Sequence, residues 1–185
     1  MTEVSSLTGR LLVATPALAD PNFDRSVVLL LDHDAEGALG VVLNRPTPVG
    51  VAEVLRPWAE LAGEPGVIFQ GGPVGLDAAL GVAAVPGAGP LGWRRVHGSI
   101  GLVDLDAPPE VLAAEVGSLR IFAGYAGWAA GQLERELEEG AWYVVESEPG
   151  DVSVPEPESL WRAVLRRQRG TLAMMATYPE DPSLN

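Results

Sequence analysis

Cysteine and lysine are both absent from this 185-residue chain, and histidine occurs only twice. Without cysteine there is no disulfide framework, no thiolate ligand for a metal and no cysteine nucleophile. Without lysine there is no Schiff-base amine and no lysine for a phosphate-binding loop. We therefore expect a protein without a cofactor and without a metal centre.

Long apolar runs are missing as well. No run reaches the 18 or so apolar residues of a transmembrane helix, and the N-terminus lacks the basic flank and apolar core of a signal peptide. These features predict a cytoplasmic protein that does not contact a membrane.

The charge balance is strongly acidic, with 12 basic against 25 acidic residues and a net charge of −13. Nucleic-acid binding depends on neutralising phosphates, so direct contact with DNA or RNA is not expected. The 47% apolar content is sufficient for a sizeable core. We expect one domain over residues 7–178, with terminal tails at 1–6 and 179–185.

Apolar patterning predicts an α+β fold, because strands outnumber helices and follow no regular alternation. The expected strands lie at residues 7–13, 26–31, 38–43, 67–70, 80–85 and 100–105. The second and third form a hairpin whose loop is longer than two residues. The expected helices lie at 51–62, broken at Pro57, and at 109–116 and 158–169.

The stretch from Leu119 to Val145 reads as the central unit of the chain. It predicts a strand at 119–122, a glycine turn at 124–131, an amphipathic helix ended by Gly140, and a returning strand at 142–145. The glycines could open an anion site at the helix N-terminus. Because no Lys, Ser or Thr accompanies them, tight packing of Tyr125 and Trp128 is the preferred interpretation.

Other short motifs give weak signals. Residues 87–92 match G-x-G-x-x-G, but Pro90 interrupts them and the context is that of a loop. Asp32 and Asp34 are neighbours in a turn, and such side chains rarely converge on one metal ion.

Two histidines and two of the serines could supply the catalytic residues of a hydrolase. His33 or His97 would act with Ser26 or Ser99, but such sets arise by chance and are established only by geometry.

Several motifs together resemble the bacterial YqgE/AlgH family over nearly the whole chain. They are Pro16–Val27, His33, Gly37–Pro46, Gly71–Pro73, Gly124–Trp128, Gly131–Glu134, Trp142 and Trp161–Arg162. The resemblance implies a single compact α+β domain with a mixed, mostly antiparallel sheet curled into a pseudo-barrel with flanking helices. The family is mostly uncharacterised, and some members carry the label of transcriptional regulator.

The family motifs gather in turns at strand ends, where binding residues often lie. We hypothesise that these turns meet at one ligand-binding surface for a small anion or carboxylate, or for a protein partner. Its candidate residues are Arg25, Ser26, Asn44, Arg45, Gly71, Gly72, Gly124, Tyr125 and Trp128. A regulatory or binding module is thus preferred over an enzyme, with the histidine–serine hydrolase as the alternative, and no catalytic residue is assigned.

Overall fold

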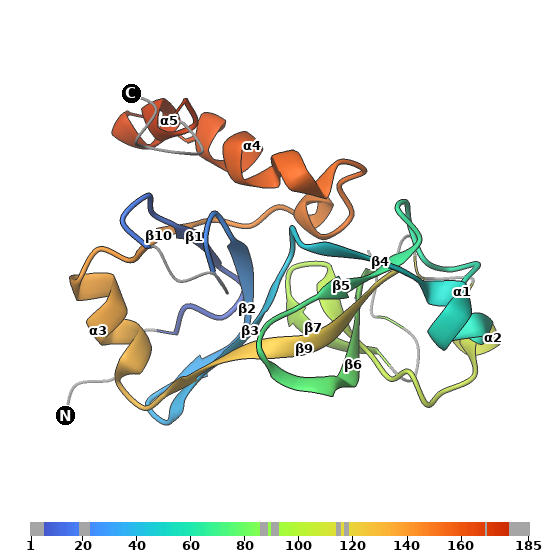
Figure 1. Cartoon of the computed structure of the whole chain (residues 1–185). Helices are drawn as coiled ribbons and strands as arrows, with labels where there is room; N and C mark the ends of the chain where they lie inside the picture. Colours follow the sequence, from blue (N-terminus) through green and yellow to red (C-terminus); the bar gives the residue numbers. More distant parts are fainter. Residues whose placement is uncertain are drawn as a thin grey trace.

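The computed structural model describes residues 6–18, 23–85, 89, 93–113, 116, 119–168 and 170–177. Their strands form one curled, mostly antiparallel sheet, and short helices flank it (Figure 1). Most of the loop expected at 87–92 and nearly all of both expected tails lie outside the described residues. The predicted fold class, a single α+β domain, is confirmed.

The sheet is organised around β9 (Leu119–Ala129), because three other strands pair with it. One arm runs β10–β1–β2–β3, with β10 at Trp142–Val145, β1 at Leu11–Ala14, β2 at Val27–Asp34 and β3 at Gly37–Val42. A second arm is β6–β8–β7, at Val74–Ala84, Ile100–Val103 and Trp93–His97. The parallel partner of β9 is β5 (Val67–Gln70), which also pairs with β4 (Pro46–Gly50).

The sheet divides where β3 and β5 meet along β9. The Gly71 N–H donates to Ala123 O at 2.8 Å, and Val42 N–H donates to Gly71 O at 2.8 Å. The chains approach so closely that a Cβ on Gly124 would lie 2.5 Å from Gly72 O, and Gly124 has a φ of 76°. Glycine is required here for both reasons.

The glycine turn expected at 124–131 is wrong. The chain continues as β9 through Tyr125 and Trp128, and helix α3 (Gln132–Glu138) begins only after Gly131. Buried and more exposed positions alternate from Gly124 to Ala129, which is the period of a strand, and Gly124 allows the close backbone approach of Gly72 within the sheet.

Other expected elements differ in length. The β2–β3 hairpin closes with a two-residue loop, since β2 ends at Asp34 and β3 begins at Gly37, so the longer loop is wrong. The first helix is reduced to α1 (Val51–Val54) and a 3₁₀ turn, η1 (Arg56–Trp58), because Pro57 interrupts it. Strand β7 was not expected, because two adjacent arginines interrupt the alternation of apolar and polar residues that indicates a strand.

The remaining helices are short. They are α2 (Pro109–Leu112), the 3₁₀ turns η2 (Pro149–Val152) and η3 (Pro157–Ser159), α4 (Leu160–Arg166) and α5 (Thr171–Met175). Figure 1 shows α4 and α5 covering the arm that contains β1 and β10. Leu160, Val164 and Leu165 of α4 are buried in the main core cluster with Leu11, Leu29 and Phe69. Packing against the sheet therefore stabilises α4 more than its own seven residues could.

Candidate functional site

Arg25 has an unusual backbone. Its φ is 54°, and no other non-glycine residue has a positive φ in the part of the chain that the structure describes. Both ends of the Asn44 amide hold this turn: its Nδ2 donates to Arg25 O at 2.9 Å, and its Oδ1 accepts the Val27 N–H at 3.0 Å. A left-handed arginine costs free energy, so the surrounding bonds must compensate for it.

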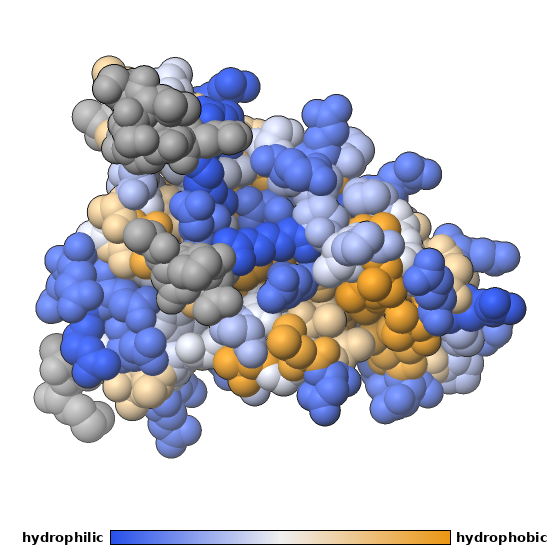
Figure 2. Space-filling model, in the orientation of Figure 1, coloured by the Kyte–Doolittle hydropathy of each residue, from blue (hydrophilic) through white to orange (hydrophobic). Residues whose placement is uncertain are grey.

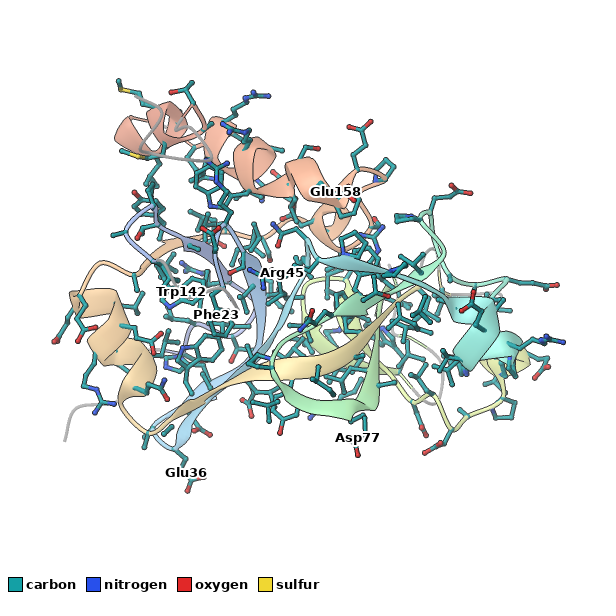
Figure 3. The ribbon with its side chains drawn as sticks, in the orientation of Figure 1. Phe23, Glu36, Arg45, Asp77, Trp142 and Glu158 are labelled. Carbon is teal, nitrogen blue, oxygen red and sulfur yellow. The ribbon has the colours of Figure 1, made fainter. Side chains whose placement is uncertain are left out.

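Arg45 connects this turn to the glycine segment. Its Nη2 donates to Asp24 O at 3.0 Å, and its own carbonyl accepts the Gln70 N–H at 2.8 Å, one residue before Gly71. Figure 3 shows Arg45 near the centre of the molecule in this view. Hydrogen bonds thus connect Asn44 and Arg45 to the Arg25 turn, and the Arg45 backbone lies beside Gln70, the residue before Gly71.

Trp161 of α4 completes the arginine cluster. The Arg25 guanidinium lies 4.4 Å from its ring centroid, and that of Arg162 lies at 5.9 Å. The indole Nε1–H donates to Ala14 O at 2.8 Å, which fixes the ring in a buried position. Sequence reasoning did not place Trp161 in the site, although the Trp161–Arg162 family motif was a signal for it.

The two aromatic residues expected in the site, Tyr125 and Trp128, lie in different surroundings. Trp128 is 6% exposed and packs with Phe23 and Trp142, with centroid distances of 6.3 and 6.1 Å. Its indole N–H donates to Glu136 at 3.0 Å. Tyr125 is half-buried on β9 beside Gly72. Trp128 is therefore part of a core cluster, while Tyr125 borders the glycine segment.

His33 is engaged through both ring nitrogens. Its Nδ1 accepts the Leu7 N–H at 2.9 Å, and its Nε2 lies 2.8 Å from Glu134 Oε1. An acceptor at Nδ1 implies a proton on Nε2. The pKa of Glu134 is lowered, mainly because its carboxylate accepts this hydrogen bond.

The serines are not paired with histidines. The Ser26 hydroxyl is buried and donates to Phe23 O at 2.7 Å. Within the described part of the chain, no hydrogen bond joins His33 or His97 to Ser26 or Ser99. A nucleophile needs its base within bonding reach, so this geometry gives the hydrolase alternative no support.

Arg120 is a buried cation that sequence reasoning missed. It is 3% exposed and lies 4.4 Å from the Phe69 ring centroid. Its Nη2 donates to Glu64 O and Val154 O, both at 2.8 Å, which ties two distant segments to β9. Burial lowers the pKa of Arg120 to about 10. An arginine between Leu119 and Ile121 carries no pattern that distinguishes it from a surface residue.

An acidic hollow lies beside the β2–β3 hairpin, lined in part by Asp32, Asp34 and Glu36. The Asp34 carboxylate accepts the Glu36 N–H at 2.8 Å, as expected for a polar turn. No group of three or more potential metal-ligating His, Asp or Glu side chains occurs among the described residues. None of the helices that the structure describes has the length and the apolar content of a membrane-spanning helix.

Known proteins resemble this chain over most of its length. The AlgH-like family matches residues 11–173. A UPF0301 protein of Streptomyces coelicolor is 80% identical over 190 residues, covering 100% of this chain and 98% of the relative. One from Mycobacterium tuberculosis is 50% identical over 181 residues, covering 96% and 90%.

Two solved structures share the fold. A crystal structure of a protein from Corynebacterium diphtheriae is 32% identical, with a TM-score of 0.89 over 96% of this chain and 95% of that one. The solution structure of the AlgH protein from Pseudomonas aeruginosa is also 32% identical, with a TM-score of 0.68 over 97% and 99%. The sequence and the fold together establish that this chain belongs to the AlgH-like family, which includes the UPF0301 proteins.

Proposed function

We propose that the protein is a cytoplasmic binding module with a regulatory role, which recognises a small anion or a carboxylate at the cluster of Arg25, Asn44, Arg45 and Trp161. The carrying observation is that Asn44 holds Arg25 at a φ of 54° while the Arg25 guanidinium stacks on Trp161. Strained backbone that neighbouring groups over-determine is concentrated at functional sites.

The chemistry of the cluster suits an anion. An arginine that stacks through its face presents its N–H donors in the plane of the guanidinium, where carboxylate and phosphate groups bind in bidentate geometry. The protein as a whole is acidic, with a net charge of −13, so a group of arginines around one turn is a local departure from that charge. An acidic scaffold of this kind favours a small anion over a nucleic acid, which would bring many phosphates against the remaining acidic surface.

A non-catalytic role is preferred over hydrolysis because His33 and Ser26 each bind a different partner. Their hydrogen bonds contribute to the packing of the N-terminal segment and of the Arg25 turn.

A thermal-shift screen tests the proposal, since a ligand that binds the native state raises the melting temperature. The probes are phosphate, sulfate, citrate and acetate, at constant ionic strength. We expect at least one of them to stabilise the wild-type protein. Arg25→Asn should lose most of that response while remaining folded, because asparagine tolerates the left-handed region.

Arg10→Asn is the matched control. Arg10 pairs with Glu146 on the exposed surface, at 3.1 Å, so its replacement should leave the anion response unchanged. The proposal fails if none of the four anions stabilises the wild type, or if Arg25→Asn responds as strongly as Arg10→Asn.

A further inference from the structure

Exposed aliphatic side chains surround a groove that is lined by residues of β4, β5, β6 and β9. Val49 is 37% exposed, Val54 61% and Leu76 56%. Figure 2 shows hydrophobic residues gathered on this side of the molecule, over the region that Figure 1 labels β4, β5 and β6. Single exposed aliphatic residues are ordinary, whereas a contiguous group marks an interaction surface.

The groove has a volume of about 280 Å³ and an apolar lining. Ile68 and Ala123 of the sheet contribute to it together with the exposed aliphatic residues. Pockets for whole small-molecule ligands usually measure about 300–1,000 Å³. The groove lies at the lower end of this range, and it has room for one or two apolar side chains of a peptide.

An irregularity in β6 shapes one wall of the groove. Val74 pairs with Tyr125 and Ala79 pairs with Ala123, so four residues of β6, 75–78, lie opposite one residue of β9. A Cβ on that residue, Gly124, would lie 2.9 Å from the Leu76 Cδ2 atom. Bulges of this kind re-aim side chains, and this one leaves the strand with Leu76 exposed beside the groove.

The other wall does not favour addition of a strand. β4 pairs with β5 alone among the described strands, which leaves an edge. Pro46 and Pro48 in β4 have no N–H to donate, and prolines protect sheet edges against extra strands. Insertion of side chains into the groove is therefore the mode of binding that this surface permits.

Charge indicates the kind of occupant. Asp77 lines the groove and is exposed, and the other described residues of the lining carry no charge. Figure 3 shows it projecting from β6 at the edge of the molecule. A second copy of the chain would bring another net charge of −13, which opposes self-association.

We propose that this groove binds an extended, apolar peptide segment of a partner protein, with an arginine or lysine of the segment placed against Asp77. The site is separate from the arginine cluster around Trp161, and neither proposal depends on the other.

Selection from a library of random short peptides displayed on phage tests this site. The wild-type protein is the target, and the Leu76→Asp variant removes non-specific binders. We expect enriched peptides that combine apolar residues with a basic one. For a synthetic peptide of that sequence, Leu76→Asp and Val54→Asp should each raise Kd about tenfold or more, equivalent to about 1.4 kcal/mol.

Charge reversal and two controls sharpen the test. Asp77→Arg should weaken the binding of the basic peptide. It should strengthen the binding of the same peptide with glutamate in place of its basic residue. Met174→Asp replaces a residue of α5 that is 70% exposed, and Arg25→Asn alters the arginine cluster, so both should leave Kd unchanged. Circular dichroism spectra establish that each variant is folded.

Four results would overturn the proposal. They are the absence of any enriched peptide, selected peptides without basic residues, binding that Leu76→Asp leaves intact, and a wild-type dimer in size-exclusion chromatography that Leu76→Asp dissociates. The last result would assign the groove to a second copy of the chain.

Discussion

Replacing Asn44 with alanine should destabilise the protein substantially, although the side chain is only partly buried. The substitution removes two hydrogen bonds at once, to Arg25 O and from the Val27 N–H. Val27 is fully buried, so its N–H gains no water in exchange. The left-handed conformation of Arg25 also loses the group that holds it.

The magnitude follows from these contacts. Each hydrogen bond contributes about 1 kcal/mol, and a buried backbone group left without a partner costs about 1–3 kcal/mol. We expect a loss of about 2–4 kcal/mol in the free energy of unfolding. For a chain of this length, 1 kcal/mol corresponds to about 2–4 °C, so the melting temperature should fall by about 4–16 °C.

Urea denaturation followed by circular dichroism measures the change, and a thermal melt checks it. Asn44→Asp keeps the acceptor for the Val27 N–H but loses the donor, so its stability should be intermediate. Gln168→Ala is the matched control, because that amide makes a single hydrogen bond, to Val164 O at 2.8 Å. A change below about 0.5 kcal/mol for Asn44→Ala, the range of neutral surface substitutions, would refute the role given to Asn44.

Three further predictions concern the sheet crossing, the His33–Glu134 hydrogen bond and the Asp151–Arg167 ion pair. Gly124→Ala should cost more than about 2 kcal/mol or prevent folding, because its Cβ would lie 2.5 Å from a backbone oxygen at a φ of 76°; a wild-type urea midpoint would contradict this. The pKa of Glu134 is lowered by the His33 hydrogen bond, so the stabilisation is present above the unfolded value near 4.5 and is lost as pH falls through the lower folded value. Glu134→Gln should therefore flatten the decline in melting temperature below pH 4.5, and an unchanged acid profile would count against the pairing. Asp151→Asn should cost about 2–4 kcal/mol, because the Asp151 carboxylate is 3% exposed and binds Arg167 through two contacts of 2.7 Å; a loss below about 1 kcal/mol by urea denaturation would show that the pair contributes little.

The order of most elements could be predicted from sequence, because apolar runs and prolines are local signals. The strand at 67–70 is present with the predicted bounds, and Pro57 does interrupt the first helix. The prediction for the central unit was wrong at residues 124–131. Glycines there indicate a turn, unless a distant segment of the same chain passes close to them. Gly72 approaches from more than 50 positions away, and no local pattern records that approach.

The candidate site was partly predictable for the same reason. The Arg25 turn, Asn44 and Arg45 stood out as polar residues at strand ends, and the structure places them together. Trp128 also stood out, but its partner Phe23 and the acceptor Glu136 draw it into the core. The position of Trp161 against Arg25 depends on how α4 packs, which periodicity within the helix cannot show.

Composition and patterning by themselves determined the acidic surface, the chemistry that missing cysteine and lysine exclude, and the α+β class, because each depends on residue type or on neighbours along the chain. Only the tertiary structure decided that β9 runs unbroken through its glycines, that Arg120 is buried beneath two distant carbonyl groups, and that the irregular β6 leaves an apolar groove beside β4. These features arise from contacts between residues far apart in sequence, and their free energy exists only when the chain is folded.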